Sequence, residues 1–167
     1  MGRKRGFLFG NRRRKSLFVF ILFVVAIAYF LRREEVHFQR PEESDKCSGT
    51  AGCFTGIVNR VIDGDTLEVN SFRIRLVLVD ASEWNAAGGT AATSYLRQLC
   101  PVGSQALVDQ DDRQHTDNYG RLLAVVWCGG KRVNEEILRE GHARIYRRFC
   151  SQSEFGDQPW AVGMGCP

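Results

Sequence analysis

The sequence predicts a small, mainly β domain in which five strands form a Greek-key barrel with two to three helices, preceded by one N-terminal transmembrane or signal helix. Three observations predict this arrangement. Short segments rich in β-branched residues alternate with Gly, Asn and Asp turn signals. Two stretches with helical periodicity interrupt or follow these segments. One uninterrupted apolar run lies near the N-terminus, directly after a basic segment.

The five expected strands are residues 56–62, 66–69, 72–79, 105–109 and 122–128. Asp63-Gly64 is a strong signal for a tight turn between the first two. In the third, the two-residue period places Arg75 on a largely apolar strand, on the same face as Val77 and Val79. A guanidinium there costs free energy unless a carboxylate, a phosphate or water receives it. Arg75 is therefore a candidate functional residue.

Two helices are expected. Thr90 is a suitable N-cap for residues 90–100, and Pro101 ends that segment. Asn134 is expected to cap a second helix that stops at Gly141. The charged loop at 111–117 is expected to be mostly solvated, and the Gly- and Pro-containing tail after residue 150 is too irregular for a long helix. Five strands and two helices in this order imply a barrel of OB type.

The N-terminal third divides into three segments, followed by the domain at 52–167. Residues 1–15 contain seven basic residues, residues 16–33 include an apolar run of fifteen, and residues 34–51 form a polar linker. We interpret these as a basic cytoplasmic N-terminus, a transmembrane signal-anchor and a tether, with the domain outside. The alternative is a secreted protein whose signal peptide is cleaved near Ala28, in the sequence Ala26-Ile27-Ala28.

The formal net charge of +4 does not describe the predicted domain. Residues 1–33 hold nine Lys or Arg and no acid, so the remaining 134 residues carry fourteen basic and nineteen acidic side chains. A general basic field, which dominates non-specific duplex binding, is therefore excluded there. Local arginines and a bound cation would have to hold any nucleic acid.

All six cysteines follow the apolar run, at positions 47, 53, 100, 128, 150 and 166. Disulfides are the leading hypothesis for a domain outside the cytoplasm, and buried free thiols are the alternative. No two cysteines have the C-x-x-C spacing typical of zinc sites, so a zinc site is not expected. Six cysteines allow fifteen pairings, so the connectivity stays open. Cys47 with Cys53 and Cys150 with Cys166 are the pairs to test first.

Several motifs occur in a specific order. They are DGDT at 63–66, IRLVLVD at 74–80, Glu83, DNYGRLLA at 117–124 and VNEEILREG at 133–141. This pattern, which spans about half of the chain, resembles the staphylococcal nuclease-like (thermonuclease) family. The resemblance implies an OB-type barrel and an enzyme that hydrolyses phosphodiester bonds of DNA and RNA with Ca²⁺, leaving 3′-phosphate ends.

The resemblance also implies the site residues. The metal ligands would be Asp65, Asp80 and the main-chain carbonyl of Ala81, and the catalytic residues would be Arg75, Glu83 and Arg121. Ala81-Ser82 stands where the family commonly has Thr-Pro, so the loop that places Glu83 is freer. A main-chain ligand does not need the threonine side chain.

Three further residues are candidates for substrate binding: Asp117, Tyr119 and Tyr146. Tyr146 begins a basic-aromatic stretch that either stacks on a base or only closes the barrel edge. DNA, RNA and the membrane are the expected partners; no protein partner is inferred, and a monomer is expected. The alternative function is a non-catalytic OB-type module that binds nucleic acid or protein while tethered to the membrane. A third possibility is a structural domain held by disulfides.

Overall fold

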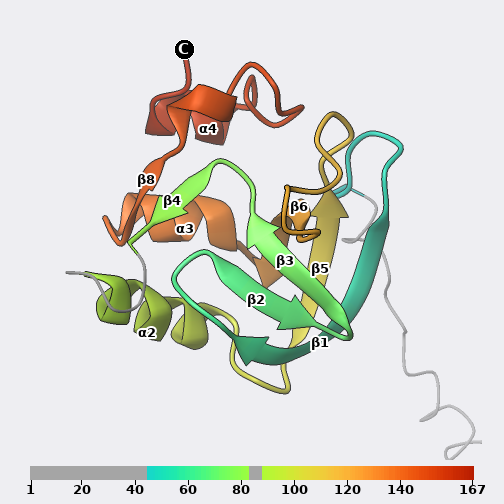
Figure 1. Cartoon of the computed structure of the whole chain (residues 1–167), viewed down its shortest axis with the longest axis vertical. Coiled ribbons are helices and arrows are strands. Elements are labelled where there is room, and N and C mark those ends of the chain that lie inside the picture. Colours follow the sequence, from blue (N-terminus) through green and yellow to red (C-terminus); the bar gives the residue numbers. More distant parts are fainter. Residues whose placement is uncertain (1–44, 83–87) are drawn as a thin grey trace, which may run out of the picture. The chain divides into compact units, whose positions relative to one another are not determined.

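The computed structural model describes residues 45–82 and 88–167 (Figure 1). The expected cytoplasmic segment, the expected anchor and most of the expected linker lie outside the described residues, as does Glu83. Within the described part, no helix combines the length and apolar character needed to cross a membrane.

Five strands form a closed barrel, which confirms the predicted fold. They are β1 (Cys53–Val61), β2 (Thr66–Val69), β3 (Phe72–Leu76), β5 (Gln105–Gln110) and β6 (Leu122–Cys128). Along the sheet they follow the order β3-β2-β1-β5-β6, with each neighbouring pair antiparallel. A parallel pairing of β3 with β6 closes the ring. Because these two strands are parallel, their N-terminal ends meet at the same end of the barrel.

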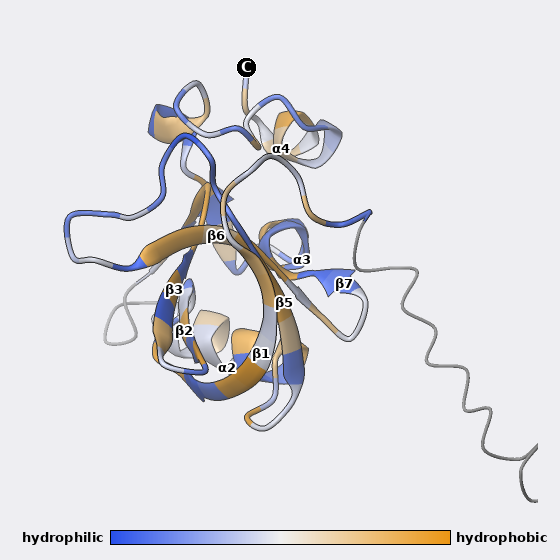
Figure 2. Cartoon of the chain, turned by 90° about the vertical axis from the view of Figure 1, so that its right-hand side faces the viewer, coloured by the Kyte–Doolittle hydropathy of each residue, from blue (hydrophilic) through white to orange (hydrophobic). Residues whose placement is uncertain are grey.

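The barrel interior is apolar. Figure 2 shows the apolar segments along the ring of strands. Each barrel strand contributes a fully buried aliphatic residue: Val58, Leu67, Ile74, Val108 and Val126. Burial of such side chains stabilises the fold by about 1.5 to 3 kcal/mol each.

The expected third strand at 72–79 is wrong in its second half. β3 ends at Leu76, and a turn at Val77 and Leu78 separates it from β4 (Val79–Ala81). Leu78 has a φ of 62°, an uncommon backbone conformation for a bulky residue, and its side chain is buried. β4 then leaves the barrel and pairs with β8 (Ala143–Ile145). A single extended strand would have kept this segment within the barrel sheet.

In the described part of the chain, three α-helices pack outside the strands, namely α2 (Gly89–Leu99), α3 (Val133–Arg139) and α4 (Pro159–Met164), with a 3₁₀ turn, η1 (Arg147–Phe149), before α4. The predicted cap of the first helix is wrong, because Thr90 lies inside α2 and Gly88 is the N-cap with a φ of 86°. α2 buries Ala92 and Leu96. α4 has only six residues, as the composition of the tail predicts.

Asn134 does not cap a helix. α3 begins one residue earlier, after the short strand β7 (Lys131–Arg132), and Arg132 occupies the N-cap position. The Asn134 side chain is fully buried. Its Oδ1 accepts the Val126 N–H at 3.0 Å, and its Nδ2 donates to the carbonyls of Val77 at 2.9 Å and Ala124 at 3.2 Å. Asn134 therefore ties α3 to β6 and to the turn after β3.

All six cysteines form disulfides, and both pairs singled out from the sequence are present. Cys47 is bonded to Cys53 and Cys150 to Cys166, while Cys100–Cys128 joins the end of α2 to the end of β6. Three disulfides in a domain of this size indicate an extracytoplasmic location, because thiols stay reduced in the cytosol.

The charged loop after β5 is less solvated than the sequence predicts. Asp111 is fully buried, and its Oδ1 accepts the N–H groups of Arg113 at 2.8 Å and Gln114 at 3.1 Å. Asp109 Oδ2 accepts both the N–H and the hydroxyl of Ser48. Asp112 accepts the N–H groups of Thr50 and Ala51. These carboxylates replace water as partners of backbone N–H groups, so residues 48–51 are bound to the domain.

Candidate active site

The turn between β1 and β2 directs Asp65 inward. Asp63 Oδ1 accepts the Asp65 N–H at 3.1 Å, and the Thr66 carbonyl accepts the N–H groups of Ile62 at 2.9 Å and Asp63 at 3.3 Å. These bonds fix the backbone on both sides of Asp65, whose side chain is only 4% exposed. The turn therefore delivers a buried carboxylate to the site.

Gly64 lets this turn approach the neighbouring elements closely. A β-carbon at Gly64 would lie 2.5 Å from the Cβ of Ala92 in α2 and 2.8 Å from the Cβ of Ala81 in β4. Neither backbone-fixed methyl group can rotate away. Glycine is needed here to bring the turn, α2 and β4 together, rather than for a left-handed conformation.

Both oxygens of Asp65 have partners. Oδ1 accepts from Arg75 Nη1, in an ion pair, and from the Thr66 hydroxyl at 2.9 Å. Oδ2 accepts the Ala81 N–H at 3.1 Å. Arg75 also donates to the Val79 carbonyl at 3.3 Å. Asp65 thus connects β2, β3 and β4, and the requirement that Arg75 find a carboxylate is met.

Burial raises the pKa of Asp65 from its usual 3.8 to about 6. Arg75 opposes this shift, and the charge of Asp63 adds to it, while the hydrogen bonds from Ala81 and Thr66 oppose it. The ion pair with Arg75 therefore does not fully compensate the lost hydration of the carboxylate. An additional cation beside Asp65 would favour its charged form.

Arg121 is held at the start of β6 by Asp117. Arg121 Nε donates to Asp117 Oδ2 at 2.6 Å, and Asp117 Oδ1 accepts the backbone N–H groups of Arg121 at 3.0 Å and Tyr119 at 2.9 Å. Burial alone would raise the pKa of Asp117, but the hydrogen bonds from Arg121 and Tyr119 and the charge of Arg121 lower it. Asp117 is a persistently ionised anchor for this guanidinium.

The two arginines flank one buried pair of residues. Arg75 lies opposite Thr66 in the β2–β3 register, and Arg121 Nη1 donates to the Thr66 hydroxyl at 3.3 Å. The parallel pairing of β3 with β6, with Ile74 opposite Leu122, brings both guanidinium groups to the same end of the barrel. The structure thus brings together Asp65, Arg75 and Arg121 around Thr66.

The backbone of Ala81 faces the same place. Tyr146 N donates to the Leu78 carbonyl, so residues 78 and 146, directly beyond the end of the β4–β8 ladder, face each other as a hydrogen-bonded pair. Such pairs alternate, so Ala81 opposite Ala143 is a non-hydrogen-bonded pair and its backbone groups face away from β8. Its N–H reaches Asp65, and we infer that its carbonyl lies on the same edge. Asp80, the neighbouring residue of β4, is half-buried.

The remaining predicted residues are less closely involved. The Tyr119 side chain is 83% exposed, and its ring centroid lies 5.3 Å from Arg121 Cζ. Tyr146 is half-buried and packs edge-on against Phe149, with ring centroids 4.7 Å apart. Glu83 lies outside the described residues. Asp117 contacts Arg121, so any effect on substrate acts through that arginine.

One residue of the site was missed by the sequence reasoning. The Thr66 hydroxyl touches both Asp65 and Arg121, and its side chain is 1% exposed. Its position in the DGDT motif was a signal, but the contact with Arg121 spans 55 residues of sequence. Only the closure of the barrel brings these two residues together.

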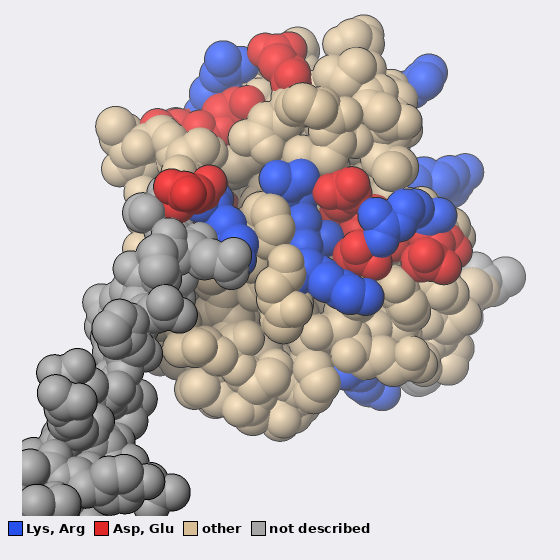
Figure 3. Space-filling model, turned by 180° about the vertical axis from the view of Figure 1, so that it is seen from behind, with Lys and Arg blue, Asp and Glu red and all other residues tan. Residues whose placement is uncertain are grey.

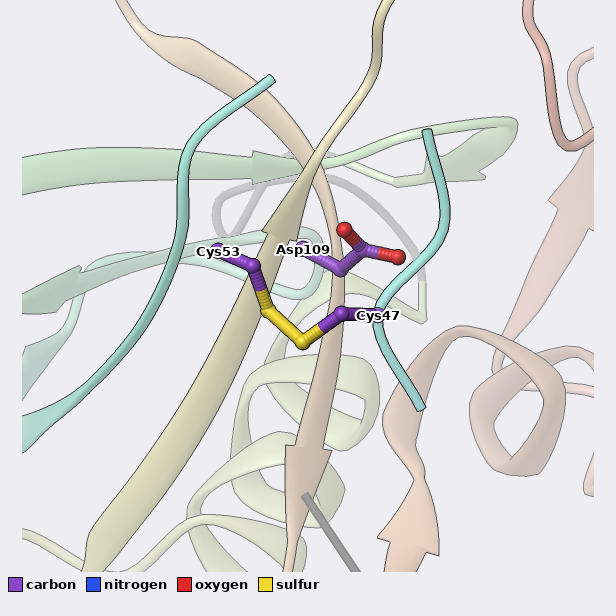
Figure 4. A group of neighbouring side chains, drawn as sticks. All are labelled: Cys47, Cys53 and Asp109. Carbon is purple, nitrogen blue, oxygen red and sulfur yellow. A yellow bond between two sulfur atoms is a disulfide. The ribbon is translucent and has the colours of Figure 1, made fainter. Parts of the chain in front are cut away.

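The donor types on the predicted metal-binding residues are those that a hard cation accepts. Asp65 and Asp80 offer carboxylate oxygens, the Ala81 carbonyl offers a third oxygen, and burial leaves Asp65 short of positive charge. Among the His, Cys, Asp and Glu side chains of the described residues, the only group of three whose ligand atoms lie within 4.8 Å of one another is Cys47, Cys53 and Asp109. Figure 4 shows that its two sulfur atoms form a disulfide, so this group is a structural bridge.

On the face drawn in Figure 3, basic and acidic side chains lie interspersed, and neither sign forms a continuous patch. This agrees with the acidic balance of the residues after the N-terminal segment. Recognition of a polyanion would therefore depend on a few placed guanidinium groups.

Comparison with known proteins assigns the chain to a family. The model of the staphylococcal nuclease homologue family matches residues 73–159, and the chain belongs to this family. The matched range contains Arg75, Asp80, Glu83 and Arg121, whereas Asp65 precedes it. A member of this family is expected to use a metal ion.

Several relatives from Bacillus subtilis (strain 168) are named endonucleases. The chain is 35% identical to endonuclease YncB over 112 residues, which cover 60% of this chain and 52% of YncB. It is 34% identical to the SPbeta prophage-derived endonuclease YokF over 112 residues, 60% of this chain and 37% of YokF. It is 33% identical to endonuclease YhcR over 133 residues, 70% of this chain and 11% of YhcR. The chain thus matches about half or less of each relative.

Proposed function

We propose that this protein is an extracytoplasmic endonuclease that hydrolyses phosphodiester bonds of DNA and RNA. The observation that carries the proposal is the pair of guanidinium groups, Arg75 and Arg121, held on either side of the buried Asp65 and Thr66 at one end of the barrel. Family membership and the endonuclease names of the relatives support the same class of activity.

Phosphodiester hydrolysis requires positive charge, because the substrate is an anion and gains charge on its phosphate oxygens in the transition state. Arg75 and Arg121 supply planar donors for those oxygens. Asp65 and Asp117 hold the two guanidinium groups in place before the substrate arrives. Preorganised donors of this kind stabilise the transition state more than the ground state.

Asp65, Asp80 and the Ala81 carbonyl would hold a Ca²⁺ ion, which accepts six to eight oxygen ligands at flexible geometry. When bound, it supplies further positive charge to the phosphate oxygens. Glu83 would accept a proton from the attacking water or orient it. The 3′-phosphate product follows from the family resemblance and requires that the bond to the 5′ oxygen is the one that breaks.

The exposed ring of Tyr119 lies beside Arg121 and would stack on a base next to the scissile phosphate. Tyr146, at the end of β8, is the second candidate for such a contact. Asp117 would contribute by holding Arg121. The proposed enzyme is a monomer.

The N-terminal segment at 16–33 would anchor this domain to the membrane, with residues 1–15 in the cytoplasm. Protease added to intact cells should then remove the domain. Protection of the domain, or a soluble form that begins near Tyr29, would contradict the anchored arrangement and, in the second case, favour cleavage near Ala28.

The activity is tested by release of acid-soluble nucleotides from single-stranded DNA and from RNA by the full chain in non-ionic detergent. We expect cleavage with Ca²⁺, none with a calcium chelator, and recovery on adding Ca²⁺ back. Arg75→Ala and Arg121→Ala should each lower turnover on the order of 10² to 10³, as for loss of one preorganised donor. Arg97→Ala, on the exposed side of α2, is the matched control and should equal wild type.

Activity that survives the chelator would refute the metal part of the proposal. An Arg121→Ala variant as fast as wild type would refute the role of that arginine. Binding of single-stranded DNA without any cleavage by the wild type would favour the alternative of a non-catalytic module. Labelling of product ends before and after phosphatase treatment distinguishes 3′-phosphate from 3′-hydroxyl termini.

A further inference from the structure

The two ion pairs of the site are joined by one hydroxyl group. Arg75 is paired with Asp65, and Arg121 is paired with Asp117. The Thr66 hydroxyl donates to Asp65 Oδ1 at 2.9 Å and accepts from Arg121 Nη1 at 3.3 Å. Among the hydrogen bonds of the described residues, this oxygen is the direct link between the two pairs.

The direction of both bonds is fixed by chemistry. A guanidinium group has donors and no acceptor, so Arg121 must donate. An ionised carboxylate only accepts, so the single hydrogen of the Thr66 hydroxyl must point at Asp65. A lone pair of the same oxygen is then left to face Arg121. The hydroxyl has one orientation that satisfies both neighbours, and its burial keeps water from replacing either bond.

Asp117 alone does not fix the Arg121 guanidinium. Asp117 Oδ2 meets Nε, on one side of the planar group, whereas Thr66 meets Nη1. Contacts at two different nitrogens restrict rotation about the bond from Nε to Cζ, which one contact does not. The backbone of Thr66 is itself held, because its carbonyl accepts two N–H groups and it lies opposite Arg75 in the β2–β3 register.

We propose that Thr66 is a positioning residue that sets the orientation of Arg121 through its side-chain hydroxyl and couples Arg121 to the Asp65–Arg75 pair. The expected effect on kcat rests on the proposed endonuclease function. The structural coupling between Thr66 and Arg121 does not depend on that function. Thr66 would not touch the substrate; its effect would pass through the plane of the guanidinium group, which decides how well Arg121 meets the phosphate oxygens.

The variants that isolate the hydroxyl are Thr66→Val, which keeps the shape and removes the hydroxyl, and Thr66→Ser, which keeps the hydroxyl. Thr66→Ala is a second variant without the hydroxyl, in case Thr66→Val fails to fold. Near-ultraviolet circular dichroism and the melting temperature establish that each variant is folded. Arg121→Ala identifies the Arg121 resonances by their disappearance.

The first measurement is independent of activity. Nitrogen-15 exchange spectroscopy of the full chain in detergent micelles gives the rate of rotation of the Arg121 guanidinium about the bond from Nε to Cζ. We expect slow rotation in wild type and Thr66→Ser, and several-fold faster rotation in Thr66→Val or Thr66→Ala. Equal rates in all of these proteins would overturn the proposal, even if the protein cleaves nucleic acid as expected.

The second measurement is a double-mutant cycle in kcat on single-stranded DNA with Ca²⁺. Thr66→Val should lower kcat by about tenfold, the effect of losing one hydrogen bond to a charged group, with KM changed by less than about twofold. Thr66→Ser should recover most of this loss. In an Arg121→Ala background, Thr66→Val should have little further effect, because its action passes through Arg121.

Equal losses from Thr66→Val in both backgrounds would overturn the positioning role and indicate a general structural effect. A wild type without activity would refute the proposed endonuclease function, while the rotation rates would still decide whether Thr66 holds Arg121. The two failures are therefore distinguishable.

Discussion

The disulfide between Cys100 and Cys128 should contribute most to stability among the three bridges. Its two residues are 28 positions apart, against 16 for Cys150–Cys166 and 6 for Cys47–Cys53. In the chain-entropy description, the constraint on the unfolded chain grows with the logarithm of the closed loop. The three bridges are then worth about 3.5, about 3 and about 2 kcal/mol, respectively.

Burial increases the difference between the Cys100–Cys128 and Cys47–Cys53 bridges. The side chains of Cys100 and Cys128 lie in the core, whereas Cys47 and Cys53 are half-buried. Replacing the buried pair by alanine also leaves a cavity between α2 and β6, which adds on the order of 1 kcal/mol. We therefore expect Cys100→Ala/Cys128→Ala to lower the free energy of unfolding by about 4 to 5 kcal/mol.

The assay is urea unfolding of the full chain in non-ionic detergent, followed by tryptophan fluorescence, with a chelator present so that no bound cation adds to stability. The matched control is Cys47→Ala/Cys53→Ala, which should lose about 2 kcal/mol. The reasoning is refuted if this control loses more than the Cys100/Cys128 variant, or if the latter loses less than about 1 kcal/mol.

Three further predictions concern single residues. The folded-state pKa of Asp65 is raised from 3.8 to about 6, so its stabilising contribution is present below pH 3.8 and is lost as pH rises to about 6. We expect the unfolding free energy of wild type minus that of Asp65→Asn, measured by urea unfolding with a chelator present, to fall by about 3 kcal/mol as the pH rises across that window. A difference that does not change with pH would contradict the prediction. Glu83→Gln should lower turnover by roughly 10² to 10⁴, measured by nucleotide release. The exposed control Glu140→Gln should not lower it. Equal rates in Glu83→Gln and wild type would exclude proton transfer by Glu83. Asn134→Ala should cost about 3 kcal/mol of unfolding free energy, since it leaves buried backbone groups unpaired; a loss below about 1 kcal/mol would show that water replaces the amide.

The strands could be predicted because their signals are local. Alternating β-branched residues and the Asp63-Gly64 turn give β1, β2 and the start of β3 without reference to the rest of the chain. The break after Leu76 could not be predicted in the same way. An apolar segment that continues without Gly or Pro looks like one strand, yet the backbone turns at Leu78 because β4 finds its partner in β8, more than sixty residues later in the sequence.

The same limit explains the errors at Asn134 and Asp111. Asn at the start of a helical stretch and Asp in a polar loop have well-known local roles, as caps and as solvated turn residues. In this fold, Asn134 instead binds β6 and the turn after β3, and Asp111 binds the N–H groups of its own loop while buried. Local patterns give the secondary structure, but they do not say which polar side chains the tertiary structure encloses.

Disulfide pairs between cysteines that are close in sequence could be predicted, and the distant pair could not. Cys47–Cys53 closes a short loop, and Cys150–Cys166 encloses a C-terminal tail whose only α-helix is the six-residue α4, so each pair follows from proximity along the chain. Cys100–Cys128 required knowledge that the end of α2 lies beside the end of β6, which only the barrel topology provides. The site combines both kinds of contact. Asp65 and Arg75 are brought together by neighbouring strands, whereas Arg121 joins them only because the barrel closes.

The Cys150–Cys166 disulfide stabilises the C-terminal segment more than it stabilises the barrel. The site residues Asp65, Arg75 and Arg121 stand on strands or turns of the closed barrel, whereas Cys150 and Cys166 both lie after the last barrel strand. α4, with six residues, is too short to be stable by itself and depends on the burial of Trp160 and on the Cys150–Cys166 bridge. Loss of that bridge should therefore loosen the C-terminal segment before it disturbs the two arginines. Hydrogen exchange of a Cys150→Ala/Cys166→Ala variant should show faster exchange in α4 with unchanged protection in β2 and β3; an equal loss of protection in both regions would show that the tail supports the barrel directly.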